Sequence, residues 1–369
     1  MKRTPFYPEH VAHGATMYEA QGWEMPAQYG EINAEQLAVR QNVGVTDFSS
    51  TGEIEIQGRD ALTLVQRVIV NDAGRMPVHR VLYSTMCRPD GTILADVTIY
   101  RLGPERYMVM TAWGSNGANE RVEYDWLCRH AEGLDACITD VSSGVALLAL
   151  QGPRSRQVLA GLTDADLASL PYMWAVPARI AGIRGLVSRT GYTGELGYEL
   201  LCPAEHAHDL WEALLSAGKP FGLTLCGHRA VFNLRLDKGY IARFDMSGAT
   251  PYEVGLGWTV KLGKGDFVGR DALARQQAEG VARRLVSLQV AGEHIPAAGE
   301  TLTYGGRAVG QVTSGGYSVV FRQPVGLGFV PSDLPVGAEL EIQGADGLLH
   351  PARIAPRPMY DPEGVRLRS

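Results

Sequence analysis

The sequence has few cysteines and no long apolar run. Its five cysteines are scattered, and none lies in a Cys-x-x-Cys pair. An odd, dispersed set argues against a disulfide framework and a structural zinc site, so we expect reduced, mostly buried thiols. No stretch approaches the roughly 18 consecutive apolar residues of a membrane span, and the start lacks the apolar segment of a secretory signal. We therefore expect a cytoplasmic protein with no membrane partner.

An excess of basic residues is also missing. Lys and Arg number 34 against 40 Asp and Glu, which gives a formal net charge of −6. Nucleic acid is therefore not an expected partner. The sequence has no phosphate-binding loop, no His-Glu-x-x-His motif and no Gly-x-Ser-x-Gly elbow, and GKGDFVG has the wrong spacing for a dinucleotide fingerprint. Nucleotide hydrolysis, zinc proteolysis and a Rossmann fold thus lack support.

Two histidine pairs have spacings that a metal could use. They are His10 with His13 and His206 with His208. This spacing alone does not distinguish a metal ligand from an ordinary side chain, and we interpret these side chains as solvated histidines at helix ends. The sequence predicts no metal site.

The 369 residues, 45% of them hydrophobic, suffice for two or three domains with buried cores. Strand patterns at residues 92–102 and 106–112 alternate with helical patterns at 118–133 and 204–218. Residues 184–203 resemble one long strand. A charged connector near 275–284 precedes short strands and glycine-rich turns, which predict a separate β-domain, a small barrel. The fold class is therefore α+β.

The segment SRTGYTGELGYE, residues 188–199, contains three glycines around Glu195. A glycine-bracketed turn lets the backbone approach a ligand and aims the carboxylate inward. Such a carboxylate accepts two N–H donors side by side, as on a guanidinium group or the edge of a pterin. Two interpretations of Glu195 remain open: a recognition residue, or an ordinary surface charge.

Asp96 interrupts the otherwise apolar strand TILADVTIY. Burial of an unpaired carboxylate is costly, so an Asp in mid-strand lies either on a wet face or at a site that uses it. Alternation with Leu94 and Thr98 leaves both interpretations open.

Five separated motifs nevertheless form a recognisable set. They are the opening RTPFYPEHVAHGATMYEAQGWEMPAQYG with EQLAVRQNVGVTDFS, the strand GTILADVTIYRL, the turn SRTGYTGELGYE, the segment LRLDKGYIARFDMSGATPYEVGLGW, and the late GQVTSGGYS with VGLGFV. In this order and over nearly the whole chain, they resemble the aminomethyltransferase family, the glycine-cleavage T-protein and its relatives.

The resemblance implies a three-domain folate-binding fold with two interleaved α+β lobes and a C-terminal β-barrel. A folate-binding region would span residues 1–275, with one lobe at 1–48 plus 141–275 and the other at 49–140. The barrel domain would span residues 276–369. The implied activity is the transfer of a one-carbon group to tetrahydrofolate.

The resemblance also implies roles for individual residues. Asp96 matches the family's catalytic aspartate beside the folate nitrogens, and Glu195 matches the glutamate that grips the pterin edge. Aromatic and arginine side chains surround folate in the family. The candidates here are Tyr83, Tyr192, Arg229, Arg235 and Trp258.

The sequence departs from the T-protein pattern at three places around the transfer site. Ser50 and Thr51 replace His-Met, Ala95 replaces the first aspartate of a pair, and Thr111 replaces an asparagine. We expect Thr51 and Thr111 to line the donor pocket. The segments RAVFNLRLDKGY and PRPMYDPEGVRLR look more like the folate domains of dimethylglycine- and sarcosine-oxidising enzymes and of folate-dependent demethylases.

These departures favour a tetrahydrofolate-dependent enzyme that takes a methyl or methylene group from a small methylated or aminomethyl donor. One alternative is a T-protein that acts on the lipoyl carrier protein. A second is a non-catalytic folate-binding protein of the iron–sulfur assembly type, against which the retained Asp96 argues. Donor identity and oligomeric state are not written in the sequence.

Overall fold

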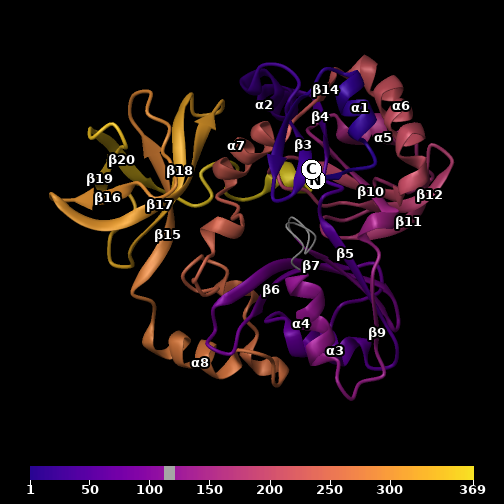
Figure 1. The fold of residues 1–369 in the computed structure, drawn as a ribbon, viewed down its shortest axis with the longest axis horizontal. Helices are drawn as coiled ribbons and strands as arrows, with labels where there is room; N and C mark the ends of the chain where they lie inside the picture. Colours follow the sequence, from indigo (N-terminus) through magenta and orange to yellow (C-terminus); the bar gives the residue numbers. More distant parts are fainter. Residues whose placement is uncertain (112–120) are drawn as a thin grey trace. The chain divides into compact units, whose positions relative to one another are not determined.

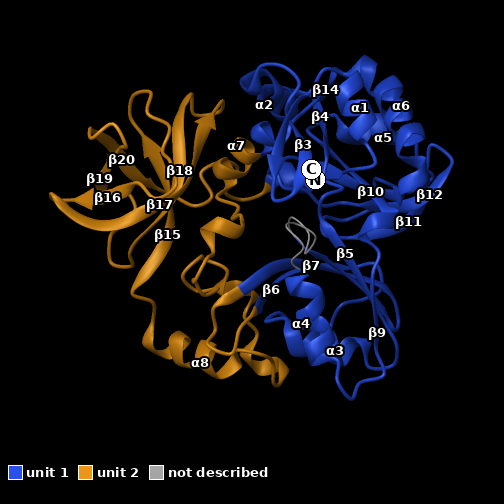
Figure 2. Cartoon of the chain, viewed as in Figure 1, with its two compact units in different colours: residues 1–86, 94–231, 365–369 blue, residues 87–93, 232–364 orange. Residues whose placement is uncertain are grey.

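The computed structural model describes residues 1–111 and 121–369 (Figure 1). The chain forms two compact units, and it passes between them more than once (Figure 2). The first unit comprises residues 1–86, 94–231 and 365–369, and the second comprises residues 87–93 and 232–364. This partition differs from the predicted division at residues 48, 140 and 275, which stays a prediction.

A six-stranded sheet of order β11-β12-β13-β10-β4-β14 forms one half of the first unit. Its central strand β10 is an unbroken apolar run because both of its faces are covered. Leu148 packs on one face with Leu159, Leu210 and Trp211, whereas Leu147 packs on the other. The strands are Val43–Asp47 (β4), Val145–Gln151 (β10), Ala175–Ile180 (β11), Ile183–Ser188 (β12), Gly197–Pro203 (β13) and Leu223–Leu225 (β14). The accompanying helices are Tyr7–Ala12 (α1), Ile32–Gln41 (α2), Ser155–Ala160 (α5) and Ala207–Gly218 (α6).

A five-stranded sheet of order β6-β7-β8-β5-β9 forms the other half. Strand β7 alternates: Ala95, Val97 and Ile99 join a core that includes residues of α3 and α4, while Tyr100 lies in a different cluster. The strands are Gly52–Gln57 (β5), Val81–Cys87 (β6), Ile93–Gly103 (β7), Arg106–Thr111 (β8) and Cys137–Asp140 (β9). The helices are Ala61–Val68 (α3) and Val122–His130 (α4).

Smaller elements occur in both units. A three-stranded sheet of order β1-β3-β2 contains Lys2–Arg3 (β1), Thr16–Ala20 (β2) and Trp23–Gln28 (β3). Helix α7 (His228–Lys238) begins in the first unit and ends in the second, and α9 (Val365–Arg368) returns to the first. Short 3-10 helices occur at Ser142–Gly144, Ala204–His206, Lys219–Phe221, Arg243–Asp245, Gly257–Thr259 and Leu262–Lys264.

The second unit contains helix α8 (Arg270–Glu279) and a closed barrel of order β15-β18-β17-β16-β19-β20. Inward side chains such as Leu288, Val312 and Ile354 fill the barrel. Closure removes exposed strand edges, which explains how short strands separated by tight turns form a stable body. The strands are Arg283–Val290 (β15), Thr301–Tyr304 (β16), Arg307–Ser318 (β17), Gln323–Pro331 (β18), Glu339–Gln343 (β19) and Leu349–Ala355 (β20).

The predicted α+β class with a C-terminal barrel is confirmed. Two local predictions are wrong. Residues 184–203 form two strands, β12 and β13, because the glycine-rich turn separates them. The connector at 275–284 begins inside α8, which ends at Glu279 before Gly280. Residue 112 of one predicted strand and residues 118–120 of one predicted helix lie outside the described residues.

The five cysteines are free thiols, as predicted. Cys87, Cys202 and Cys226 are buried, and Cys128 and Cys137 are exposed. Within the described residues, no helix is long and apolar enough to cross a membrane.

Candidate functional site

The two large sheets of the first unit meet through a cluster of apolar side chains. Tyr100, Met108 and Met110 contribute from the five-stranded sheet, and Leu147 and Leu201 contribute from the six-stranded sheet. Side chains on one face of a strand recur every second residue. The same alternation therefore places three polar groups on the facing surfaces: Asp96 and Glu53 on β7 and β5, and Glu199 on β13.

Asp96 lies on β7, on the face opposite Ala95 and Val97. Its Oδ2 accepts a hydrogen bond from the Tyr83 hydroxyl at 3.0 Å. Tyr83 is itself positioned on β6, where its carbonyl oxygen accepts a hydrogen bond from Asn71 Nδ2 at 2.9 Å. The structure thus brings two predicted residues together, and the phenol orients the carboxylate.

Glu199 is a buried carboxylic acid on β13. Its Oε2 accepts hydrogen bonds from the hydroxyls of Thr190 and, at 3.4 Å, Tyr100. Ser188 Oγ donates to the Tyr100 hydroxyl at 3.3 Å, so the hydroxyls form a short network. Burial raises the pKa of Glu199, although the Thr190 and Tyr100 hydrogen bonds oppose the shift. Tyr100 lies on β7 with Asp96, and its contact with Glu199 therefore joins the two sheets.

Glu53 is a second buried acid, on the facing surface of the five-stranded sheet. Its Oε1 accepts a hydrogen bond from Thr51 Oγ1 at 2.8 Å. Burial raises the pKa of Glu53 to about 8; the Thr51 hydrogen bond opposes this shift, and the negative charges of Asp140 and Glu199 add to it. Glu53 therefore holds a proton at neutral pH.

This proton makes the folding stability depend on pH. The ordinary pKa of the Glu53 carboxyl is 4.5, and the folded protein raises it to about 8. Between these pH values the unfolded chain releases a proton that the folded chain keeps. The contribution of Glu53 to the free energy of unfolding therefore falls as the pH rises. We expect Glu53→Gln to raise the melting temperature at pH 8 relative to wild type and to change it little at pH 5.

The control for this experiment is Glu55→Gln, two residues along β5. Glu55 forms an ion pair with the partly exposed Arg106. Its replacement should not reproduce the selective gain at pH 8. An equal shift at pH 5 and pH 8 in Glu53→Gln, measured by thermal unfolding, would contradict a proton held on Glu53.

Glu195 lies in the turn between β12 and β13 and is almost fully buried. Its Oε1 is 3.2 Å from Arg40 Nη1, and its Oε2 is 2.7 Å from Arg366 Nε. Arg40 Nη1 also donates to the Thr193 carbonyl at 2.7 Å. The guanidinium partners that the sequence allowed for this carboxylate are thus two arginines of the chain itself. The interpretation of Glu195 as a surface charge is wrong, and its predicted contact with a pterin stays a prediction.

The glycines around Glu195 have a packing role. A Cβ on Gly191 or Gly197 would lie 2.0–2.3 Å from the side-chain amide of Gln151. That amide donates to the Thr190 carbonyl at 3.1 Å and accepts from Thr193 Oγ1 at 2.9 Å. The turn therefore closes over Gln151.

The remaining predicted folate residues are distributed over both units. Tyr192 is half-buried in the turn of the first unit. Arg229, on α7, is exposed and donates to Gln28 Oε1 at 3.3 Å. In the second unit, buried Arg235 pairs with Asp245 at 2.7 Å, and Trp258 is 61% exposed. The roles of all four in folate binding stay predictions.

Buried Arg235 also has a structural function. Its guanidinium donates to the Tyr240 carbonyl and to Ser314 Oγ, in addition to the Asp245 carboxylate. These contacts join α7 to the barrel strand β17 within the second unit.

The three departures from the family pattern lie in different environments. Thr51 donates to Glu53 and to the Phe48 carbonyl, so it belongs to the surface that carries Glu53. Ala95 is packed in the apolar core, on the face of the sheet opposite Asp96. Thr111 pairs with Val97 and Gly52, and alternation along β8 places it with Tyr107 and Val109 on that same core face. The role of Thr51 and Thr111 in a donor pocket stays a prediction.

Comparison with known proteins gives full-length matches. Residues 6–264 match the GCVT N-terminal domain, and residues 283–361 match the glycine cleavage T-protein C-terminal barrel domain. This chain belongs to the aminomethyltransferase family. Aminomethyltransferases of Moorella thermoacetica and Streptomyces coelicolor are each 40% identical to it, over 98% of both chains.

A solved member of the family has the same fold. The glycine cleavage system aminomethyltransferase T of Bartonella henselae aligns with a TM-score of 0.90 and 28% identity, over 98% of both chains. The predicted resemblance is therefore confirmed.

Sequence reasoning missed Glu53 and Glu199. Glu199 interrupts the apolar strand GYELLCP just as Asp96 interrupts its own strand, so the same argument could have found it. Glu53 lies in EIEIQG, where ordinary alternation suggests a solvated face. Only the sheet packed against β5 makes that face an interior one.

Proposed function

We propose that this member of the aminomethyltransferase family is a transferase that moves an aminomethyl-derived one-carbon unit to tetrahydrofolate, with a lipoyl carrier protein as donor. The observation that carries the proposal is the combination of full-length family membership with an Asp96 carboxylate held by Tyr83. The aminomethyltransferase names of the relatives, together with the match to the glycine cleavage T-protein barrel domain, favour an aminomethyl donor over a small methylated compound.

The residues around Asp96 and Glu199 fit a reduced folate. A pterin presents adjacent N–H donors on its edge and apolar ring faces. Carboxyl oxygens of Asp96 and Glu199 are acceptors for such donors, and Met108, Met110 and Leu201 supply apolar contact surface on the same cluster. Bound tetrahydrofolate supplies the amine that accepts the carbon unit.

Asp96 acts on that amine. An amine is a weak nucleophile toward a carbon electrophile. A carboxylate within about 3 Å orients it and accepts its proton as the new N–C bond forms and the bond between that carbon and the leaving group of the donor breaks. The negative charge also stabilises the developing cation. The Tyr83 hydroxyl keeps the Asp96 carboxylate in one orientation.

Glu199 is our candidate for recognition of the pterin edge. Both oxygens of Glu195 already face arginines, whereas the partners of Glu199 are the Thr190 and Tyr100 hydroxyls. N–H donors from a ligand would favour the ionised form and offset the burial that raises the Glu199 pKa.

We expect Glu199→Gln to weaken tetrahydrofolate binding about tenfold or more, because charge-assisted hydrogen bonds are worth about 1.5–3 kcal/mol. Calorimetric titration measures this change. The matched control is Glu205→Gln at the exposed 3-10 helix that follows β13, which should bind as wild type does. If Glu199→Gln binds tetrahydrofolate with wild-type affinity, Glu199 does not belong to the folate site.

The experiment that tests the function is a pair of donor assays. The protein is incubated with tetrahydrofolate and an aminomethylated lipoyl carrier, and in parallel with a panel of small methylated amines, ethers and thioethers. We expect 5,10-methylene-tetrahydrofolate from the carrier. Product from the small donors alone would favour the demethylase-like activity suggested by Thr51, and folate binding without product from any donor would favour a non-catalytic folate-binding protein.

A further inference from the structure

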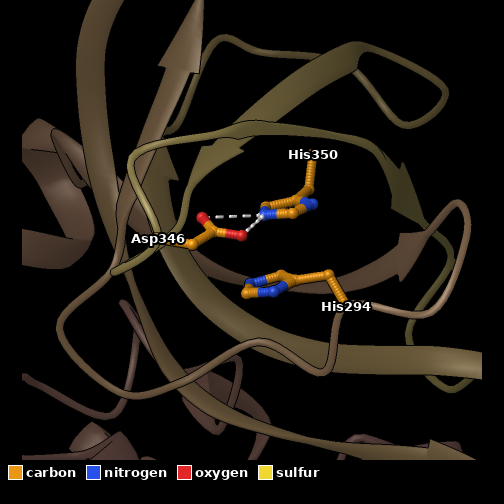
Figure 3. Close-up of side chains that lie close together, drawn as sticks. All are labelled: His294, Asp346 and His350. Atoms are coloured by element: carbon orange, nitrogen blue, oxygen red, sulfur yellow. Dashed lines mark hydrogen bonds and ion pairs between the residues drawn. The ribbon is translucent and has the colours of Figure 1, made fainter.

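Two histidines and an aspartate meet on the barrel of the second unit (Figure 3). His294 lies in the loop between β15 and β16, Asp346 in the turn between β19 and β20, and His350 on β20. One ring nitrogen of each histidine and one carboxylate oxygen of Asp346 lie within 4.8 Å of one another. The folate-site argument uses none of these residues.

The turn between β19 and β20 is shaped around the Asp346 carboxylate. Oδ1 accepts a hydrogen bond from the Leu348 N–H at 3.0 Å and lies 3.3 Å from His350 Nε2. Behind them, a Cβ on Gly344 would lie 2.5 Å from Asp346 Oδ1 and 2.9 Å from His350 Nε2. Glycine at position 344 therefore leaves space for the carboxylate and the ring.

His294 is oriented from the other side. Its Nε2 is 2.9 Å from Glu300 Oε2, and that oxygen also accepts the Ala297 N–H at 2.9 Å. The loop is anchored to β17, because Gly299 donates its N–H to the Val312 carbonyl. A carboxylate on one ring nitrogen fixes the tautomer, and a neutral ring keeps a lone pair on the other nitrogen.

The two imidazole rings stack in parallel, with centroids 3.7 Å apart and planes 5° apart. A neutral imidazole is the form that binds a metal. Imidazole nitrogen with carboxylate oxygen is a ligand set suited to Zn²⁺ and related cations.

We propose that His294, Asp346 and His350 bind one divalent transition-metal cation, with water in the remaining coordination positions. Parallel rings direct their lone pairs along parallel lines, so binding requires the rings to open from the stack. We assign this opening to the loop at residues 291–300, which carries His294 and has no regular secondary structure. The bound cation links that loop to the turn between β19 and β20 and so stabilises the barrel.

A second group of potential ligands provides a comparison. Glu9, His208 and Glu212 also lie within reach of one cation, but this group has a single imidazole, and His208 and Glu212 are exposed. By contrast, the side chains of His294 and His350 are each 18% exposed. The barrel group thus offers two imidazoles in a partly desolvated setting, which favours a transition metal.

The test uses the full-length protein without a polyhistidine tag, titrated with Co²⁺ and Zn²⁺. We expect one cation per chain by calorimetry and visible ligand-field absorption from bound Co²⁺. His294→Gln and His350→Gln should each weaken binding about tenfold or more, and His208→Gln should bind as wild type does. No binding by wild type, or unchanged binding in both barrel variants, would overturn the proposal.

Thermal unfolding gives a readout that is independent of activity. Zn²⁺ should raise the melting temperature of wild type and of His208→Gln, and it should not raise that of His350→Gln. Asp346→Asn keeps the shape of the turn and serves if a histidine variant fails to fold. An equal Zn²⁺-induced shift in Asp346→Asn and wild type would also count against the site.

Discussion

Asp96→Asn is expected to lower kcat for one-carbon transfer about 10²-fold or more while tetrahydrofolate binding is largely retained. The change keeps the shape of the side chain and its contact with Tyr83, but it removes the charge and the proton acceptor. A positioned acid or base contributes about 10²–10⁴-fold to turnover. Steady-state kinetics with the donor that proves active, combined with calorimetric titration of tetrahydrofolate, separates the two effects.

The matched control for this variant is Asp125→Asn on the exposed face of α4. It removes the same charge from the same unit and should leave kcat unchanged. Tyr83→Phe should lower kcat less than Asp96→Asn, because it removes the group that orients the carboxylate and leaves the carboxylate itself. If Asp96→Asn turns over at the wild-type rate, Asp96 is a structural residue and the proposed proton transfer is wrong.

Glu195→Ala is expected to destabilise the first unit by about 3 kcal/mol. Arg40 has only 4% of its side chain exposed, and the variant leaves its guanidinium buried without the carboxylate. Arg366 loses its contact with the same carboxylate, so the return of α9 to the first unit is weakened. Urea unfolding measures the change as a lower midpoint.

The comparison variant is Asp135→Ala, which removes the exposed ion pair between Arg59 and Asp135. Exposed pairs contribute little, so its unfolding midpoint should stay close to that of wild type. Titration of folded Glu195→Ala with tetrahydrofolate then separates a structural role from recognition. If Glu195→Ala unfolds at the wild-type midpoint but binds tetrahydrofolate more weakly, Glu195 recognises the pterin and is not a structural residue.

The two glutamates of GYTGELGYE show why the turn is hard to interpret from sequence. Glu195 and Glu199 are four residues apart; the first stands between a glycine and a leucine, and the second between a tyrosine and a leucine. In the folded chain the first meets Arg40 and Arg366, and the second meets Tyr100. Which of the two glutamates is available to bind tetrahydrofolate therefore depends on residues far away in the sequence.

Of the four histidines predicted to be solvated, His10 contradicts the prediction, for a related reason. His10 was expected to be solvated, but it is fully buried, with Nε2 2.9 Å from Asp47 Oδ2 and Nδ1 2.7 Å from the Tyr29 hydroxyl. Asp47 is 37 residues away in the sequence, so no local spacing predicts its contact with His10. The partners of His294 illustrate the same point, since Asp346 and His350 reach it from another part of the barrel.

The sequence by itself determined the fold class, the barrel and the position of Asp96 on an apolar strand, because these depend on local periodicity and turn chemistry. The sequence also identified the family, through motifs spread over nearly the whole chain. Tertiary structure decided which polar groups are buried and what they meet. The proton on Glu53, the network around Glu199 and the arginines on Glu195 all arise where separate segments pack together, since burial and charge pairing depend on distances that residue order does not specify.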